Sequence, residues 1–247
     1  MPEVALVTGG AGGLGTAICR GLAAAGFAVA VGYRGSKAQA EQLAATLPGS
    51  GHLAIRAPVT DSAALRQTAD EIVRHCGRCD VLVNCAGTTR FVPHADLDAL
   101  DDALIDDILA TNVRGPVAAA RALLPLLKAS PRRGGGVIVN ISSIAARTAM
   151  GSNLAYCASK AALDNLTMSM ARALAPRVRV VAVAPGLVDT DFVQSLDVTW
   201  RDEQAARTPL GRLAEPTEVA AAVLAAASTF TFSTGTVFTV DGGRPLV

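Results

Sequence analysis

The chain has 247 residues, of which 51% are hydrophobic and 17% are charged, and its formal net charge is +1. This composition suffices for one sizeable core, whereas the near-zero charge excludes a general electrostatic attraction to nucleic acids or anionic membranes. No apolar stretch reaches the ~18 residues that a membrane-spanning helix requires, and no signal peptide precedes the first predicted strand, so we expect a cytoplasmic protein.

The cysteines and histidines form no pattern that indicates a disulfide framework or a metal site. An odd count of five cysteines in a large, core-rich chain argues against stapling by disulfides. Cys76 and Cys79 have the C-x-x-C spacing of a redox pair, but they fall at the end of a predicted helix, whereas a helix N-terminus is what stabilises a thiolate. The three histidines lack metal-ligand spacing, so we expect no metal.

The first predicted strand, Val4–Thr8, ends in a glycine-rich turn that leads into a helix over Leu14–Ala25. This order is typical of dinucleotide binding, because glycines let the backbone approach a pyrophosphate and the helix N-terminus offers unpaired N–H groups. The turn fits both G-x-G-x-x-G and T-G-x-x-x-G-x-G, and spacing alone does not separate the two. The residues expected at the cofactor in this turn are Gly9, Gly12, Gly13, Leu14 and Gly15.

The second predicted strand, Ala28–Tyr33, is followed by a cation where NAD-binding proteins carry an acid. A carboxylate about 20 residues after the glycine turn would hold the ribose 2′-hydroxyl of NAD. Arg34 stands at that place, with Ser36 and Lys37 close by, and these groups suit a 2′-phosphate. We therefore predict NADP(H) as the cofactor.

The alternation of strands and helices continues to the C-terminus. Further strands are predicted at Leu53–Ala57, Val81–Asn84, Val137–Ile141, Val178–Ala184 and Thr236–Val240. Further helices are predicted at Lys37–Leu47, Ala63–His75, Asp98–Leu109, Asn153–Ala175 and Pro216–Ala227. The helix Asp98–Leu109 is acidic, and the helical pattern continues after it through Asn112 to Lys128, with a bend at Gly115-Pro116. The segment 190–208 is polar with isolated bulky residues, Phe192 and Trp200, and is predicted to be a substrate flap.

Seven strands alternating with helices predict an α/β protein with a single domain over residues 1–247, a doubly wound Rossmann fold around a parallel sheet. A (β/α)8 barrel is the competing architecture, but the count falls one unit short and the glycine turn favours the open sheet. Ligands of such sheets bind beyond the carboxyl ends of the strands. Four polar or glycine-rich motifs are expected there: Gly9–Gly15, Asn84–Gly87, Ser142–Ser143 and Pro185–Gly186.

The helix predicted over Asn153–Ala175 carries Tyr156 and Lys160 one turn apart on the same face. A phenol titrates near ~10, and a nearby ammonium favours the phenolate. The pair is therefore a candidate general acid and base near neutral pH. A bare Y-x-x-x-K spacing is more often structural, but the convergence of the other motifs on the same crevice favours catalysis.

These motifs make the chain similar, over essentially its whole length, to the short-chain dehydrogenase/reductase family. The motifs that carry the resemblance are Thr8-Gly9-x-x-x-Gly13-x-Gly15, Asn84-x-Ala86-Gly87, Asn112, Ser143, Tyr156-x-x-x-Lys160, Pro185-Gly186 and Asp241-Gly242-Gly243. The resemblance implies that Tyr156 is the acid and base and that Lys160 lowers the Tyr156 pKa and binds the nicotinamide ribose. It also implies that Ser143 polarises the substrate carbonyl and that Asn112 supports a water chain from Lys160.

The resemblance also implies a set of cofactor contacts. Asn84 and Gly87 are expected on the adenine-ribose side, and Val188 and Thr190 are expected at the carboxamide. Pro58 departs from the acid that many relatives carry before Val59, and Cys85 replaces a more usual asparagine. The residues expected at the cofactor beyond the glycine turn and Arg34 are Val59, Asn84, Ala86, Gly87, Tyr156, Lys160, Pro185, Gly186, Val188 and Thr190.

Within the family, the segment Pro209–Pro216 and the C-terminal motif resemble 3-oxoacyl-[acyl-carrier-protein] reductases most. The resemblance implies reversible reduction of a ketone, such as the 3-oxo group of an acyl thioester, to a secondary alcohol, in a homotetramer. The segments 88–92, 144–150 and 190–208 are expected to shape the substrate pocket. Arg90, Arg147 and Arg172 are candidates for docking a carrier protein, and surface cations are an equally good interpretation. Two alternatives stay open: an NAD-dependent alcohol or sugar dehydrogenase of the same family, and a non-catalytic dinucleotide-sensing regulator.

Overall fold

One parallel sheet organises the protein. Within residues 2–246, which the computed structural model describes apart from the Phe192 side chain, seven strands pair in the order β3-β2-β1-β4-β5-β6-β7. The strands are β1 (Val4–Thr8), β2 (Ala28–Tyr33), β3 (Leu53–Arg56), β4 (Val81–Asn84), β5 (Gly136–Ile141), β6 (Val178–Pro185) and β7 (Val237–Val240). The sheet is open, with β3 and β7 at its edges, so the predicted doubly wound Rossmann fold is confirmed and the barrel is excluded.

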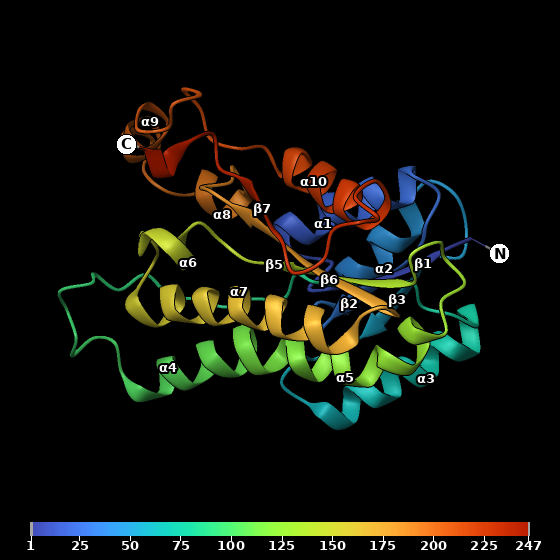
Figure 1. Cartoon of the computed structure of the whole chain (residues 1–247). Helices are drawn as coiled ribbons and strands as arrows, with labels where there is room; N and C mark the ends of the chain where they lie inside the picture. The colour runs from blue at the N-terminus through green and yellow to red at the C-terminus, as the bar shows by residue number, and fades with distance from the viewer. Residues whose placement is uncertain (1, 247) are drawn as a thin grey trace.

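Helices cover both faces of the sheet (Figure 1). α1, α2 and α10 pack on one face, and α3, α5 and α7 pack on the other, with α4 beside α7. Among the described residues the helices are α1 (Gly13–Ala24), α2 (Lys37–Thr46), α3 (Ser62–Cys76), α4 (Asp102–Leu109), α5 (Gly115–Lys128), α6 (Ala145–Thr148), α7 (Leu154–Leu174), α8 (Asp191–Gln194), α9 (Val198–Ala206) and α10 (Pro216–Ser228). No helix in this part of the chain is long and apolar enough to cross a membrane.

The inner strands are apolar on both faces because helices bury both sides of them. Alternate side chains therefore enter different cores. Val7 and Val83 pack with α1 and α10, whereas Leu6 and Leu82 pack with α3 and α5. All four side chains are fully buried, and each stabilises the fold by roughly 1.5–3 kcal/mol through the apolar surface it removes from water.

The predicted acidic helix begins later than expected. α4 starts at Asp102, not at Asp98, because Asp101 acts as the N-cap and its Oδ1 accepts a hydrogen bond from Leu104 N at 2.8 Å. The next turn, Ala110–Arg114, is a π-helix in which Gly115 N donates to Ala110 O. Pro116 explains the wider turn, because it lacks an N–H and its ring would clash with the carbonyl four residues earlier. The bend expected at this place is thus a π-turn.

Two further differences from the sequence prediction lie near the carboxyl ends of the strands. The short helix α6 follows β5 and was not predicted. The segment expected to be a flap contains α8 and α9, and of its two bulky residues Trp200 lies on α9, whereas the side chain of Phe192 is outside the described residues. Whether this segment moves stays a prediction.

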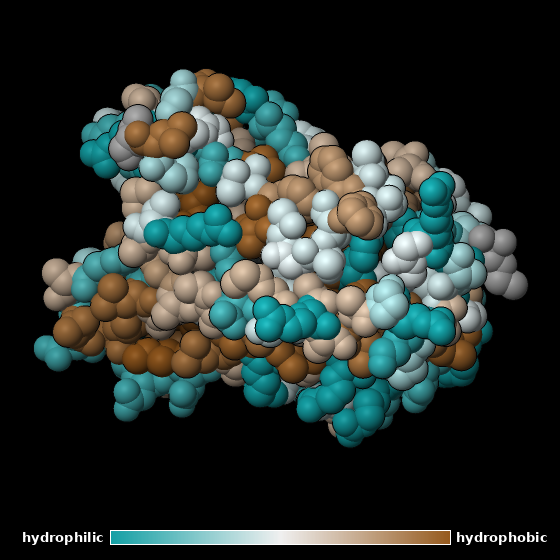
Figure 2. Space-filling view, in the orientation of Figure 1, coloured by the Kyte–Doolittle hydropathy of each residue, from teal (hydrophilic) through white to brown (hydrophobic). Residues whose placement is uncertain are grey.

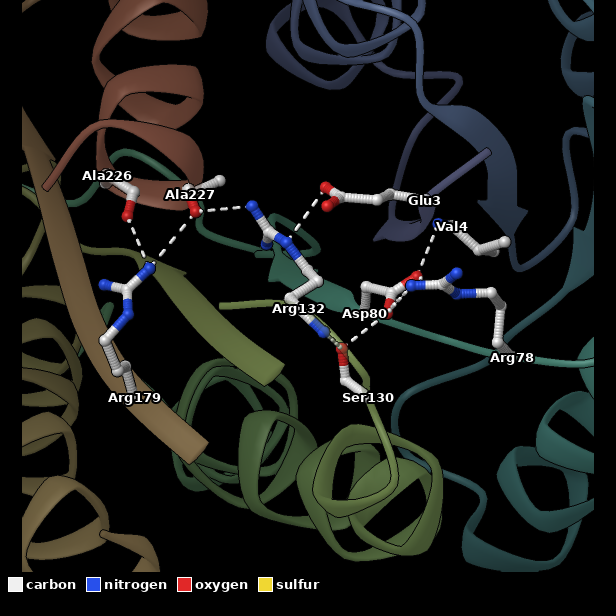
Figure 3. A network of polar contacts seen from close by, with 9 residues as sticks. All are labelled: Glu3, Val4, Arg78, Asp80, Ser130, Arg132, Arg179, Ala226 and Ala227. Atoms are coloured by element: carbon white, nitrogen blue, oxygen red, sulfur yellow. Dashed lines mark hydrogen bonds and ion pairs between the residues drawn. The ribbon is translucent and has the colours of Figure 1, made fainter. Parts of the chain in front are cut away.

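Buried arginines hold the C-terminal end of α10 (Figure 3). The Arg179 guanidinium donates to the carbonyls of Ala226 and Ala227, and Arg132 donates to Ala227 O and pairs with Glu3 at 2.9 Å. The last carbonyls of a helix have no partner within it, so these cations satisfy groups that burial would otherwise leave unpaired. Since α10 packs on α1, the same contacts support the helix that follows the glycine turn.

Asp80 joins the start of the sheet to the α5–β5 connection (Figure 3). Its fully buried carboxylate accepts hydrogen bonds from Val4 N at 2.8 Å, Ser130 Oγ at 2.5 Å and the Arg78 guanidinium at 2.7 Å. Burial alone would raise the pKa of Asp80, but the bonds from Arg78, Ser130 and Val4 outweigh burial and hold the pKa below its usual value.

The turn between β1 and α1 depends on glycine at position 15. A Cβ atom there would lie 2.2 Å from the carbonyl oxygen of Gly9, which is backbone and cannot move aside. At Gly12, in the same turn, the nearest atom to an added Cβ is Gly9 O at 3.4 Å, an ordinary contact. Gly15 therefore sets the shape of the turn, whereas Gly12 tolerates a side chain in the free protein.

We expect Asp80→Asn to lower the free energy of unfolding by roughly 3 kcal/mol at pH 7, because it removes one charge of a buried pair. Since the folded pKa of Asp80 is depressed, its contribution is present above the unfolded pKa of about 3.9 and is lost as the pH falls below it. Denaturant unfolding at pH 7 and pH 3 measures this, with Asp70→Asn on the exposed face of α3 as the matched control. An equal loss at both pH values would contradict the prediction.

We expect Gly15→Ala to destabilise the protein without cofactor by about 2 kcal/mol, since the backbone of the turn must shift to admit the methyl group. Gly12→Ala is the matched control and should change the free energy of unfolding by less than about 0.5 kcal/mol. Thermal unfolding of both variants tests the difference. Equal midpoints would show that the turn adapts and that Gly15 is not required for its shape.

Candidate active site

A cavity of about 480 Å³ opens where the strand order reverses, between β1 and β4. This is the crevice in which open α/β sheets bind ligands. Its walls are the segments that follow β1, β2, β3 and β4, together with one residue of the π-turn. The lining residues are Gly9, Ala11, Gly12, Gly13, Leu14, Gly15, Gly32, Tyr33, Arg34, Gly35, Ser36, Ala57, Val59, Thr60, Cys85, Ala86, Gly87, Thr88 and Thr111.

The Thr8 hydroxyl holds two of these walls together. Its Oγ1 accepts hydrogen bonds from Cys85 N at 3.1 Å and Ala86 N at 3.2 Å, and it donates to Val83 O at 3.3 Å. Gly9, with φ of +65°, faces the same segment, and a Cβ there would lie 2.9 Å from Ala86 Cα. The glycine turn and the segment after β4 therefore touch along their backbones, and both line the cavity together with the start of α1.

The charge of the cavity favours an anion at one end. Among the described lining residues, Arg34 is the charged side chain and none is a carboxylate. Arg34 and Ser36 are both exposed to solvent, so both can reach a ligand. Lys37 does not line the cavity and instead pairs with Glu41 at 3.6 Å. The arrangement can bind a nucleotide that carries a phosphate near Arg34.

Lys160 lies at the opposite end, on α7. The side chain is almost fully buried, its Nζ donates to Ile141 O at 2.8 Å, and it lies 5.6 Å from the centroid of the Tyr156 ring. Within the described chain the ammonium has this one hydrogen-bond partner, so two of its three N–H donors stay available to a ligand. The spacing expected from sequence thus places the amine over the phenol ring.

Asn112 connects the π-turn to both of these regions. Its Oδ1 accepts from Thr88 N at 2.9 Å, and its Nδ2 donates to Thr88 O at 3.0 Å and to Ser159 Oγ at 3.1 Å. Ser159 Oγ in turn donates to Tyr156 O at 2.7 Å. The amide therefore fixes the segment after β4 and, through Ser159, the helical turn that carries Tyr156. Sequence reasoning missed Ser159, because a serine inside a helix carries no distinguishing pattern.

The cavity and the Tyr156–Lys160 pair are contiguous at Gly87. Gly87 lines the cavity, and a Cβ there would lie 3.5 Å from Asn112 Oδ1 and 3.9 Å from Lys160 Nζ. The charge of Lys160 also affects the neighbouring Cys85 thiol. Burial raises the pKa of Cys85 to about 11, whereas the positive charge of Lys160 acts to lower that pKa. A ligand that fills the cavity past Gly87 therefore meets the ammonium next.

Two adjacent serines follow β5 and have different partners. Ser142 Oγ donates to Asp164 Oδ1 on α7 at 2.6 Å, so this serine anchors the strand end. Ser143 Oγ accepts from Ala145 N at 3.2 Å, at the start of α6, and keeps its own O–H donor. Ser143 thus lies at the carboxyl end of β5, one residue removed from the anchored position.

The remaining residues expected at the cofactor divide into two groups. The segment after β6 reaches the glycine turn, since Thr190 Cβ lies 3.4 Å from where a Cβ of Gly13 would be. Pro185, Gly186 and Val188 belong to the same segment, at the carboxyl end of β6, and Gly186 N donates to Val240 O at 2.9 Å. The Asn84 side chain instead turns into the interior, where its Nδ2 donates to Asn140 Oδ1 at 2.9 Å, and it does not line the cavity.

The space-filling view shows a hollow between the lobe that carries α9 and the body that carries α7 (Figure 2). Hydrophobic side chains are visible within it. Separately, the three segments expected to shape a substrate pocket, 88–92, 144–150 and 190–208, carry exposed apolar residues, namely Phe91, Met150, Val198 and Trp200. The hollow therefore suits a substrate with apolar surface.

The other candidate groups offer little chemistry. Arg90 pairs with Asp101 at 3.0 Å and Arg147 pairs with Asp164 at 3.6 Å, whereas Arg172 is an exposed cation on α7.

Burial raises the pKa of Cys79 to about 12, and it also raises that of Cys76, so neither thiol is activated. Within residues 2–246 no group of His, Cys, Asp and Glu side chains is arranged to hold a metal ion.

Known proteins match both the sequence and the fold. A family model described as short chain dehydrogenase matches residues 3–200. A protein assigned as ketoacyl reductase 2 of the granaticin polyketide synthase of Streptomyces violaceoruber is 42% identical over 246 residues, covering 99% of this chain and 96% of that protein. The cis-4-hydroxycyclohexanecarboxylate dehydrogenase of Sinomonas cyclohexanicum is 38% identical over 249 residues, covering 99% and 97%.

A solved structure agrees with these matches. The gluconate 5-dehydrogenase of Burkholderia cenocepacia J2315, in complex with NADP and tartrate, superposes with a TM-score of 0.88 at 32% identity, covering 99% of this chain and 96% of that one. The chain therefore belongs to the short-chain dehydrogenase/reductase family and is an NAD(P)-dependent oxidoreductase.

Proposed function

We propose that the protein is an NADPH-dependent oxidoreductase that interconverts a ketone and a secondary alcohol. The observation that carries the proposal is the continuity at Gly87 between the cavity that Arg34 marks and the Tyr156–Lys160 pair. One ligand that spans this path would place a phosphate near Arg34 and its other end beside the phenol. The cofactor would supply the hydride, and the protein residues would bind the substrate and polarise its carbonyl group.

The proposed chemistry needs a proton donor beside the carbonyl oxygen. NADPH supplies the hydride when it is bound. As negative charge grows on the carbonyl oxygen, the hydroxyls of Ser143 and Tyr156 donate hydrogen bonds to it, and Tyr156 then gives up its proton. The Lys160 ammonium stabilises the phenolate that remains, because an adjacent positive charge favours the ionised form. Asn112 keeps the turn of Tyr156 in place through Ser159.

The cofactor site extends over the glycine turn, the segment after β4 and the segment after β6. The proposed contacts are Gly9, Gly12, Gly13, Leu14, Gly15, Arg34, Val59, Asn84, Ala86, Gly87, Tyr156, Lys160, Pro185, Gly186, Val188 and Thr190. Asn84 has the weakest support, since its side chain is engaged with Asn140, and a contact there would come from its backbone. The NADP-bound gluconate 5-dehydrogenase supports the choice of NADP(H).

The proposed substrate is a ketone with apolar surface, with 3-oxoacyl thioesters as the first class to test. The hydrophobic side chains visible in the hollow (Figure 2) and the similarity to a polyketide ketoacyl reductase support this choice. The hydroxycyclohexanecarboxylate dehydrogenase supports the alternative, oxidation of a cyclic alcohol. We further propose that the segment 190–208 acts as a flap and that the protein works in the cytoplasm.

We also propose a homotetramer. Hydrophobic side chains gather on the face of α4 and α7 (Figure 2), where Leu109, Leu154 and Met168 are exposed. An exposed apolar patch of this kind is typical of a protein–protein interface.

We expect Arg34→Ala to lower kcat/KM for NADPH on the order of tenfold or more while leaving kcat/KM for NADH nearly unchanged, because the guanidinium binds a group that only NADPH carries. Steady-state kinetics with both cofactors measures the change. Arg66→Ala, an exposed arginine on α3 outside the cavity, is the matched control. Wild-type preference for NADH, or unchanged NADPH kinetics in Arg34→Ala, would overturn the assignment of NADP(H).

We expect Tyr156→Phe to lower kcat on the order of 10²-fold or more, because the variant keeps the ring but loses the proton donor. The assay follows NADPH oxidation with a panel of cyclic ketones and 3-oxoacyl thioesters, and fluorescence titration reports NADPH binding separately. Near-normal turnover in Tyr156→Phe would remove Tyr156 from the mechanism. NADPH binding by the wild type without turnover of any substrate would favour the dinucleotide-sensing regulator.

A further inference from the structure

We propose that Asn153 is a positioning residue that couples the substrate-facing segment Thr88–Val92 to Tyr156, an inference that rests on the proposed function. Its side chain joins the first turn of α7 to this segment, which lies more than 60 residues earlier in the chain. Asn153 is buried to 99%, so the same amide group serves both sides in the interior of the protein.

Asn153 holds the main chain of Tyr156 directly. Its Oδ1 accepts a hydrogen bond from Tyr156 N at 2.7 Å, and its own backbone is extended, as expected of an N-cap. The carbonyl of Tyr156 accepts from Ser159 Oγ, which itself accepts from Asn112. Both main-chain polar groups of Tyr156 are thus fixed by hydrogen bonds that lead to an asparagine.

The other end of the Asn153 amide holds the segment after β4. Its Nδ2 donates to Arg90 O at 2.7 Å and to Thr89 Oγ1 at 3.2 Å. Asn112 binds the neighbouring residue, Thr88, through both its N–H and its carbonyl. The two asparagines therefore hold three consecutive residues of the segment as well as the turn of Tyr156.

Neighbouring contacts extend the connection along the segment. Val92 N donates to Ser152 O at 2.8 Å, Thr89 Oγ1 and Ser152 Oγ are 2.5 Å apart, and His94 Nε2 lies 3.1 Å from Gly151 O. Four residues between 89 and 94 are in this way bound to residues 151–153, immediately before α7. Because Thr88 also lines the cavity, the segment begins at the cavity wall beside Gly87.

The chemical consequence follows from the distance dependence of proton transfer. The carbonyl oxygen must lie within hydrogen-bond reach of the phenol, and the segment 88–92 forms one wall against which the substrate rests. Asn153 fixes the positions of both the segment 88–92 and Tyr156, so its loss shifts the segment relative to the phenol. An error of about 1 Å in such a geometry lowers rates by up to ~10²-fold. Cofactor binding should change much less than turnover, because Asn112 still holds Thr88 at the wall of the cavity.

The decisive variant is Asn153→Ser. Serine is as good an N-cap as asparagine, so the start of α7 is preserved, but its side chain is too short to reach Arg90 and adds no charge beside Tyr156. We expect kcat to fall on the order of tenfold and the substrate KM to rise, with a much smaller change in the NADPH dissociation constant. Asn165→Ser, the same substitution on the exposed face of α7, is the matched control.

A double-mutant cycle separates the connection from helix capping. Thr89→Val removes one partner of the Asn153 amide, so the losses of kcat/KM in Asn153→Ser and Thr89→Val should not add in the double variant. Additive losses would contradict the coupling. Wild-type kcat and substrate KM in Asn153→Ser, with losses only in Asn153→Ala, would reduce Asn153 to a helix cap and overturn the proposal.

Amide hydrogen exchange tests the coupling without relying on turnover. Asn153→Ser should speed exchange at Val92 N–H on the order of tenfold while leaving Cys157 N–H, inside the first turn of α7, protected. If the wild type reduces no ketone, the proposed function fails, yet this measurement still decides whether Asn153 holds the segment. Unchanged exchange at Val92 would overturn the coupling even in an active enzyme.

Discussion

The buried ammonium of Lys160 is the interaction on which the rest of the site depends. Removing a charge from water is unfavourable unless other groups replace the lost solvation. In the described chain these groups are the Ile141 carbonyl at the end of β5 and the face of the Tyr156 ring, and Lys160 forms no ion pair. Because the ammonium has no carboxylate partner there, its charge is not neutralised inside the protein and stays available to a ligand beside Gly87.

This position exists only because the sheet is parallel. Strands β1, β4 and β5 are neighbours, so the glycine turn, the segment after β4 and the Ser142–Ser143 pair all emerge at the same edge. The Thr8 hydroxyl binds the first two together, and Ser142 binds β5 to α7 through Asp164. The backbone contacts between segments leave little room for adjustment, which is why glycine is required at Gly9 and Gly15.

Strand positions could be predicted from sequence where burial on both faces produces an uninterrupted apolar run with a clear end. β1, β2 and β4 begin and end at the predicted residues for this reason. The predicted start of α4 was wrong because Asp98 and Asp101 are equally good N-caps in isolation. Asp101 differs from Asp98 by its ion pair with Arg90, a tertiary contact that the local sequence does not show. A bend could be expected from Pro116, but not the π-turn that directs the Asn112 side chain toward Thr88 and Ser159.

The candidate site shows the same division between local pattern and tertiary contact. Tyr156, Lys160 and the glycine turn stand at fixed short spacings and are recognisable in sequence. The contacts that tie the turn of Tyr156 to the segment after β4 are long-range: Asn112 binds Thr88, 24 residues away, and Asn153 binds Thr89, 64 residues away. Their chemical type is nevertheless understandable. An amide side chain donates and accepts at once, so asparagine can bridge a main-chain N–H and a carbonyl without adding charge. A carboxylate in either place could not donate to a main-chain carbonyl, and an ammonium could not accept from a main-chain N–H, so neither could make both contacts.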